Sequence, residues 1–279
     1  MIRHRFALLF LFSAATVLYS CKPDKDSEKQ PEIAVSNSYL NSIVKDICGE
    51  QTEVMSLAPP GMCPGHFDIS PSQVNQLCEC DMLLLFDFQS GISDSLSRLK
   101  EKGLGIRTIK CPEGLCLPDT YLAIARSVCD VLSQDSPEKR AEYKRQLGQI
   151  ENRLNDLRAD IHEKMEQSGL TNAKVVASVH QSVFAEWLGL DVVATFAGSD
   201  IETPKSINQC LQQAKDEVVR FVIANEQEGT VLAAALADRL KADMVVFSNF
   251  PVEQSNITGT PDFDALILEN ISCLLSAGE

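Results

Sequence analysis

The sequence is poor in residues on which many catalytic and nucleic-acid-binding sites depend. It has four histidines and one tryptophan in 279 residues, and 25 basic side chains against 39 acidic ones, for a formal net charge of −14. This shortage of cations argues against a nucleic-acid partner, because few side chains can neutralise phosphates. The motifs HExxH, GxSxG, the P-loop and the glycine-rich dinucleotide turn are all missing. These absences argue against an enzyme, including a metal-dependent hydrolase.

Apolar runs long enough for a membrane helix are also missing after the N-terminus. There, Arg3 and Arg5 precede an apolar stretch that is typical of a secretory signal and short for a membrane span. Its ending, LYSC, resembles a bacterial lipobox, in which cleavage precedes a cysteine that is then acylated. We therefore expect a signal peptide over 1–20, a lipid anchor on Cys21 and a polar tether over 21–31. Such an anchor would hold the protein on a bacterial membrane, facing the periplasm or at the cell surface.

The ten cysteines would normally suggest disulfides in an exported protein. With Cys21 acylated an odd number remains, so at least one must be free, bound to a metal or paired with another molecule. Several lie in apolar helical patterns, where a buried thiol behaves as a small hydrophobic group. Cys63, Cys111 and Cys116 differ, because they lie in loops rich in proline and glycine.

Short apolar runs alternate with amphipathic helical patterns along the rest of the chain. This alternation predicts an α/β protein with mostly parallel sheets flanked by helices. In such sheets ligands bind beyond the carboxyl ends of the strands. The predicted strands are 33–35, 82–86, 106–109, 175–178, 192–196, 221–224 and 244–247, and helical patterns cover 39–48, 71–78, 119–132 and 231–240.

One longer segment, from Ser136 to Gly169, interrupts this alternation. Ser136 is placed to cap a helix, Pro137 is suited to its first position and Gly169 to its end. Leucine and isoleucine recur every three or four residues in a single stripe. A helix of this length would be roughly 45 to 50 Å long, so we expect it to run along two lobes as a strut. The predicted divisions of the mature chain are an N-terminal lobe (32–135), a linking helix (136–169) and a C-terminal lobe (170–279).

Two of the four histidines lie where a ligand would be expected. His66 lies in the loop sequence APPGMCPGHFDISPSQV, three residues after Cys63, and His180 follows the predicted strand 175–178. Each would lie on a loop after a strand, in a different lobe, where two imidazoles could bind one cation.

The chain resembles the zinc and manganese solute-binding proteins of bacterial ABC importers, the ZnuA/TroA-like group. The resemblance is carried, in the family's order, by IAVSNSYLNSIVKDICG, APPGMCPGHFDISPSQV, KVVASVHQSVFAEWLGL, FVIANEQEGTVLAAALADRLKADMVVF and PDFDALILENISCLL. It implies two α/β lobes joined by one long rigid helix, with a divalent metal between them. It also implies a monomeric binding protein, not an enzyme, that delivers its metal to an ABC transporter permease.

The resemblance also implies metal ligands, with departures from the family's pattern. His66 matches the first family ligand and His180 the third. For the second, CPEGLCLP places Glu113 at the family's histidine position, with Cys116 close by. Cys63 lies near the family's loop aspartate.

The family's fourth ligand, an aspartate after the last strand, falls at Ser248 or Asn249, and neither is a strong anionic ligand. Glu226 and Glu228, in the loop after the strand 221–224, are further candidate anions. They could equally be charges that a helix start favours through its dipole.

Three interpretations of the site follow. In the first, His66 and His180 bind a metal together with Cys63, Cys116 or Glu113, and thiolates would favour zinc over manganese. In the second, a Cys63–Cys116 or Cys111–Cys116 disulfide shapes the site and fewer side chains hold the metal. In the third, the protein binds a non-metal ligand. A surface adhesin-like lipoprotein on the same scaffold is a further alternative.

Overall fold

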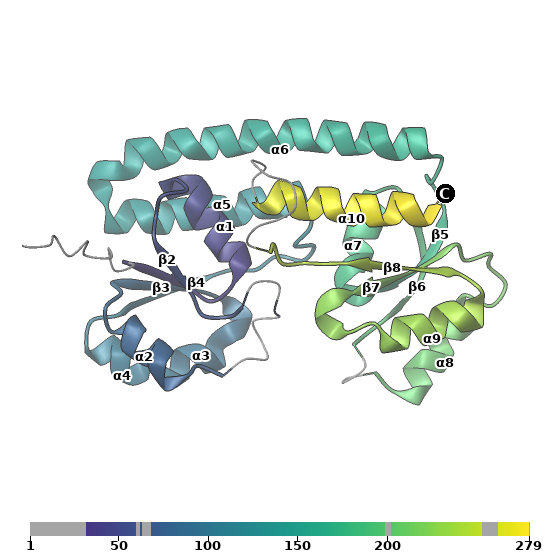
Figure 1. Ribbon diagram of the computed structural model, residues 1–279, viewed down its shortest axis with the longest axis horizontal. Coiled ribbons are helices and arrows are strands. Elements are labelled where there is room, and N and C mark those ends of the chain that lie inside the picture. Colours follow the sequence, from purple (N-terminus) through teal and green to yellow (C-terminus); the bar gives the residue numbers. More distant parts are fainter. Residues whose placement is uncertain (1–31, 60–61, 63–67, 199–201, 253–261, 279) are drawn as a thin grey trace, which may run out of the picture.

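The computed structural model describes residues 32–59, 62, 68–198, 202–252 and 262–278. Two α/β lobes lie end to end along one long helix, α6 (Arg140–Ser168), which spans both (Figure 1). Each lobe contains a four-stranded parallel sheet flanked by helices. This architecture confirms the fold class predicted from the sequence.

The sheet of the N-terminal lobe has the strand order β2-β1-β3-β4, with all neighbours parallel. Every residue of the central strand β3 is buried, as expected for a parallel sheet covered on both faces. Strand β2 was not predicted from the sequence, and its pairing with β1 identifies it. The strands are β1 (Ile33–Val35), β2 (Val54–Ser56), β3 (Met82–Phe86) and β4 (Gly105–Ile109).

The helices of this lobe begin at local capping signals. The Asn37 side chain accepts a hydrogen bond from the Leu40 N–H at the start of α1, and Ser70 and Gln73 form a capping box at the start of α2. The helical elements are α1 (Ser38–Cys48), α2 (Pro71–Leu77), the 3₁₀ turn η1 (Asp87–Gln89), α3 (Ser90–Ser95), α4 (Ser97–Glu101) and α5 (Pro118–Asp135).

The C-terminal lobe repeats this topology, with the strand order β6-β5-β7-β8. In both sheets the direction of the connections reverses between the first and third strands of the lobe, which is where such sheets bind ligands. The strands are β5 (Lys174–Ser178), β6 (Asp191–Phe196), β7 (Phe221–Asn225) and β8 (Asp243–Phe247). The helical elements are α7 (Val179–Trp187), α8 (Pro204–Gln213), the 3₁₀ turn η3 (Glu226–Glu228), α9 (Val231–Leu240) and α10 (Asp262–Gly278).

The start of the linking helix differs from the prediction. Ser136 does not cap α6, because its N–H bonds to the Leu132 carbonyl at the end of α5. Pro137 then begins a 3₁₀ turn, η2 (Pro137–Lys139), and α6 follows from Arg140. The helix ends at Gly169, whose left-handed φ of 68° suits glycine.

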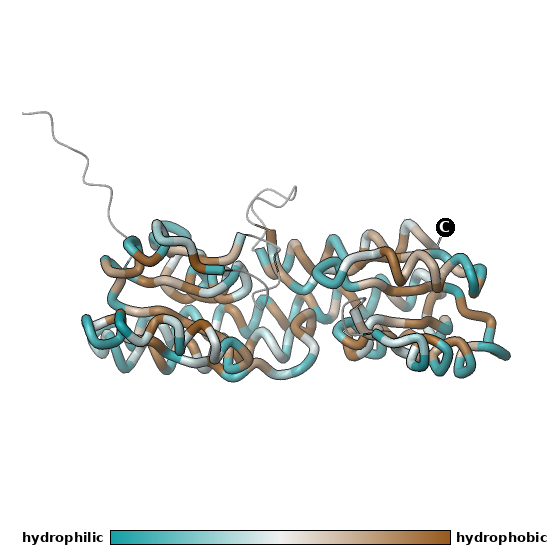
Figure 2. Tube along the Cα trace, turned by 90° about the horizontal axis from the view of Figure 1, so that it is seen from below, coloured by the Kyte–Doolittle hydropathy of each residue, from teal (hydrophilic) through white to brown (hydrophobic). Residues whose placement is uncertain are grey.

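The two lobes share one continuous hydrophobic core. Helix α10 leaves the C-terminal lobe and lies beneath α6, where it contacts both α6 and α1 of the other lobe (Figure 1). Hydrophobic stretches, brown in Figure 2, run through both lobes. The residues of α6 that are buried in this core are Tyr143, Ile150, Leu154, Leu157, Ile161 and Met165.

A buried group of charges joins α6 to both lobes. The Arg153 guanidinium donates to the two carboxylate oxygens of Asp46 in α1, at 2.9 and 2.6 Å. Its Nε lies 3.3 Å from Asp264 Oδ1 in α10, and the Tyr121 hydroxyl of α5 donates to Asp46 at 2.7 Å. Burial raises the pKa of Asp264 to about 6, although the charge of Arg153 opposes this shift. One arginine thus pairs with two carboxylates from different lobes.

We expect Arg153→Ala to lower the free energy of unfolding by about 3–5 kcal/mol, because it leaves two buried carboxylates uncompensated. The control is Arg126→Ala. Arg126 of α5 pairs with Glu151 of α6 at the surface, so this substitution should cost no more than about 1 kcal/mol. Urea unfolding of both variants checks this. Equal losses would contradict the role given to Arg153.

The raised pKa of Asp264 predicts a dependence of stability on pH. The Asp264 carboxyl is harder to ionise in the folded protein than in the unfolded chain. Its ionisation therefore lowers the free energy of unfolding increasingly as pH rises from its ordinary pKa, about 3.9, through about 6. Asp264→Asn removes that ionisation and keeps an acceptor for Arg153. Relative to wild type, this variant should therefore gain up to about 2 kcal/mol of unfolding free energy between pH 4.5 and 7.5. If the difference in unfolding free energy between the variant and the wild type does not change with pH, the pKa of Asp264 is not raised.

Candidate functional site

The carboxyl ends of the two sheets meet where the lobes touch. The thiol of Cys116, in the loop after β4, lies 3.2 Å from the Ser248 carbonyl after β8 and 4.0 Å from Gln181 in α7. Gly114 in the same loop has a φ of 73°, and a Cβ there would lie 3.2 Å from a Val183 carbon in α7. The loop of one lobe therefore packs closely on the other lobe.

His180 lies in the first turn of α7, directly after the central strand β5. Ser178 begins this helix, and its hydroxyl accepts a hydrogen bond from the His180 N–H at 3.2 Å. The His180 side chain is 58% exposed, so its imidazole is accessible from solvent. The structure thus places this predicted ligand at the carboxyl end of a central strand.

Glu228, at the end of the turn after β7, holds the His180 ring. Its Oε1 lies 2.8 Å from His180 Nδ1, and its Oε2 accepts a hydrogen bond from the Ser178 hydroxyl. The hydrogen bond that this carboxylate accepts from the ring raises the pKa of His180, against the opposing effect of burial. Burial alone would raise the pKa of Glu228, but hydrogen bonds from His180, Ser178 and Asn225 outweigh it and lower that pKa. The pair therefore favours an ionised carboxylate beside the imidazole.

Next to this pair lies a buried network of neutral amides. Asn225 Oδ1 accepts from Gln181 Nε2 at 3.2 Å and from Asn249 Nδ2 at 3.4 Å. Asn270 Nδ2 donates to the Ser248 carbonyl at 2.9 Å. These residues come from α7, β7, α10 and the segment after β8. Sequence reasoning missed the network, because its members are isolated amides up to 89 positions apart, from Gln181 to Asn270.

Cys116 is fully buried in this network. Its thiol lies 3.2 Å from the Ser248 carbonyl and 3.3 Å from Asn249 Oδ1, and burial raises its pKa well above the ordinary value. Cys116 is therefore a neutral thiol, whereas the thiolate is the form that binds metals. Cys111 and Cys116 are both free, so neither disulfide considered for Cys116 is present.

The other candidates have different surroundings. Ser248 Oγ accepts from Gln227 Nε2 at 2.8 Å and lies 3.3 Å from the Phe250 carbonyl, so contacts within its own lobe engage it. Glu113 and Glu226 are exposed. Among the described residues, no three His, Cys, Asp or Glu side chains form a group that could hold a metal ion.

Cys63 and His66, on which the predicted site also depends, lie outside the described residues. His162, in the linking helix, packs on Trp187 of α7 with ring centroids 4.8 Å apart. Of the predicted ligands, the structure therefore describes the surroundings of His180, Glu113 and Cys116, and of the further candidates Glu226, Glu228 and Ser248.

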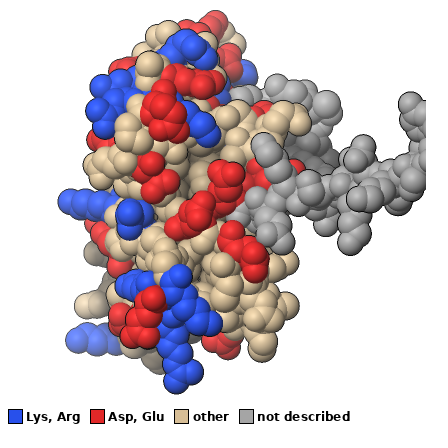
Figure 3. Space-filling view, turned by 90° about the vertical axis from the view of Figure 1, so that its left-hand side faces the viewer, with Lys and Arg blue, Asp and Glu red and all other residues tan. Residues whose placement is uncertain are grey.

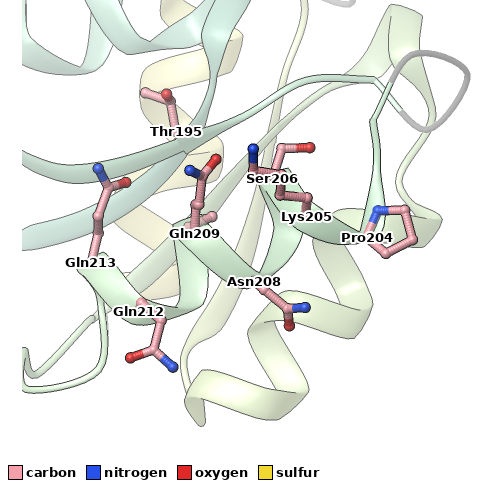
Figure 4. A pocket seen from close by; sticks show the side chains of 9 residues that line it. Thr195, Pro204, Lys205, Ser206, Asn208, Gln209, Gln212 and Gln213 are labelled. Carbon is pink, nitrogen blue, oxygen red and sulfur yellow. The ribbon is translucent and has the colours of Figure 1, made fainter.

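A separate cavity lies elsewhere. It measures about 870 Å³ and lies on the outer side of the C-terminal lobe, between β6 and α8. Figure 4 shows the amides of Asn208, Gln209, Gln212 and Gln213 along it. It contains neither His180 nor Glu228 and is separate from the candidate site.

The charged surface also bears on possible partners. Figure 3 views the molecule from the end of the N-terminal lobe, where basic and acidic side chains are interspersed. No continuous basic patch is visible among the coloured residues of that face. None of the described helices is both long and apolar enough to cross a membrane.

Two parallel-sheet lobes on a rigid helix, with a solvent-accessible histidine where the sheets meet, define a two-lobed substrate-binding protein. The family model ZnuA, "Zinc-uptake complex component A periplasmic", matches residues 33–277, so the chain belongs to the ZnuA family. Members of this family are substrate-binding proteins of metal importers and not enzymes, as the sequence predicted.

Two relatives illustrate the divergence of the chain. A "Putative metal-binding protein" of Thermotoga maritima is 23% identical over 247 residues, which cover 84% of this chain and 88% of the relative. The "Manganese ABC transporter substrate-binding lipoprotein PsaA" of Streptococcus pneumoniae is 20% identical over 198 residues, which cover 61% of this chain and 64% of that protein.

Solved structures share the fold. A crystal structure of ZnuA has a TM-score of 0.69 at 17% identity, covering 88% of this chain and 98% of the other. The laminin-binding adhesin Lmb from Streptococcus agalactiae, as a mutant, has a TM-score of 0.70 at 14% identity, covering 89% and 99%.

The buried position of Cys116 predicts its reactivity. In the folded, metal-free protein Cys116 should react with a thiol reagent at least about 100-fold more slowly than the exposed Cys78 and Cys273, because its thiol is buried and protonated. In denaturant all three should react alike. Mass spectrometry of labelled peptides measures the rates. Fast labelling of Cys116 in the folded protein would show an accessible thiolate.

Proposed function

We propose that the protein is the substrate-binding component of a bacterial metal importer. It binds one divalent transition metal, zinc in preference to manganese, where its two lobes meet, and delivers the metal to an ABC permease. A lipid on Cys21 anchors it, as a monomer, outside the cytoplasm. The observation that carries this proposal is the solvent-accessible imidazole of His180, held by Glu228 at the carboxyl end of a central strand.

The choice of metal rests on the groups around His180. Manganese prefers oxygen ligands, above all carboxylates, whereas an imidazole nitrogen suits zinc. Where the family has an aspartate after the last strand, this chain has Ser248 and Asn249, both held in hydrogen bonds to neighbouring residues. The description of the family as a zinc-uptake component supports the same choice, while the name of the relative PsaA keeps manganese as the alternative.

The proposed ligand set is His66 and His180, with Cys63 and Glu113 as candidates for the remaining positions. In chain order Cys63 and His66 come after β2 and Glu113 comes after β4, and residues that follow strands are where α/β sheets provide ligands. Cys116 is a weaker candidate ligand, because its protonated thiol already contacts Ser248 and Asn249.

We expect one zinc ion per chain in the metal-loaded protein by elemental analysis. His180→Ala and His66→Ala should each weaken zinc binding by at least about 100-fold, because each removes a group that binds the metal directly. His162→Ala is the matched control. His162 lies in the linking helix and packs on Trp187 of α7, so its substitution should leave zinc affinity unchanged. Competition titration with a zinc chelator measures the three constants. Unchanged affinity in both ligand variants would overturn the proposed function.

A further inference from the structure

We propose that Glu228 is the positioning residue of the metal site. Its carboxylate holds the His180 imidazole with Nδ1 protonated, which leaves Nε2 free to bind the metal, and Glu228 does not itself bind the ion. This inference rests on the proposed function, in which His180 is a ligand.

The geometry gives Glu228 a supporting place. Both of its carboxylate oxygens are engaged, Oε1 by His180 Nδ1 at 2.8 Å and Oε2 by the Ser178 hydroxyl. The Glu228 side chain is 14% exposed, against 58% for His180. The imidazole therefore faces solvent, and the carboxylate lies behind it.

The proton between these groups follows from their chemistry. An ionised carboxylate can only accept hydrogen bonds, so Nδ1 must be the donor. A neutral imidazole has one N–H, and with that proton on Nδ1 the lone pair lies on Nε2. Carboxylates that hold metal-binding histidines in this way fix both the tautomer and the ring orientation, and they raise the basicity of the ligand.

The surroundings explain why this carboxylate matters here. Besides His180, the side chains that hydrogen-bond to Glu228 are the neutral Ser178 and Asn225, and Asn225 in turn binds the neutral amides of Gln181 and Asn249. Ser248 and Asn249 stand where the family has an anionic ligand. Glu228 thus supplies negative charge to the site through the imidazole instead of through a direct bond to the metal.

The test compares Glu228→Gln with Glu226→Gln. Both substitutions remove one negative charge from the same turn, but Glu226 is exposed and its side chain lies 3.5 Å from Gln227. We expect Glu228→Gln to weaken zinc binding about 10–100-fold, as loss of such a supporting carboxylate does. Glu226→Gln should change the affinity less than about twofold, because its charge is in solvent.

A second measurement is independent of the metal. Nitrogen-15 NMR of the metal-free wild type should show His180 protonated at Nδ1, and Glu228→Gln should populate both tautomers. Thermal unfolding should show both glutamine variants folded at the temperature of the titrations. Wild-type His180 protonated at Nε2 would overturn the proposal without any substitution.

The outcomes separate this proposal from the proposed function. If His180→Ala and His66→Ala both leave zinc binding intact, the proposed function fails. If His180→Ala alone leaves it intact, His180 is not a ligand and the positioning role fails. If His180→Ala abolishes binding but Glu228→Gln changes neither the tautomer nor the affinity, the positioning role alone fails. If Glu228→Gln weakens binding as severely as His180→Ala, with the tautomer unchanged, Glu228 is itself a ligand and the proposal is overturned.

Discussion

The arrangement of the lobes depends on the contact of Arg153 with two buried carboxylates. Asp46 belongs to α1 of the N-terminal lobe and Asp264 to α10, while Arg153 itself lies on the linking helix. Charges removed from water destabilise a protein unless they are paired and hydrogen-bonded, so these three side chains have to stay together. The shared hydrophobic core acts in the same direction over a much larger surface. These contacts therefore hold together the two lobes that flank the candidate site.

The site combines one exposed imidazole with a buried layer of mostly neutral side chains beneath it. His180 is accessible and supported by an ionised carboxylate, whereas the side chains beneath it are amides that hydrogen-bond to one another. A buried amide network holds a defined geometry without the desolvation cost of further charges. Cys116 fits this scheme as a neutral thiol that packs the lobes together. The network thus occupies the region in which the family pattern expects an anion.

Much of the fold could be predicted from the sequence, because buried parallel strands are short apolar runs and the strut has a regular apolar stripe. Strand β2, three residues long, could not, since its place depends on pairing with β1. The exact start of α6 was also missed, because a proline suits a 3₁₀ turn as well as an α-helix.

Less of the candidate site could be predicted from the sequence. His180 could be found from its position after a strand, but its bond to Glu228 joins residues 48 positions apart. Cys116 lies in a loop rich in proline and glycine, and packing against the segment after β8 buries it completely. Burial of a loop residue is decided by segments distant in sequence, which local patterns do not encode.

The position of α10 has a consequence for how the chain folds. Phe263, near its start, is fully buried and stacks on Tyr121 of the N-terminal lobe with ring centroids 4.1 Å apart. The first lobe to be synthesised therefore lacks part of its core until the last helix has been made. Contacts between such distant segments slow folding, since the intervening chain must be ordered before they form. The N-terminal lobe should thus complete its folding only after α10 has been synthesised, and the two lobes should fold and unfold as one cooperative unit.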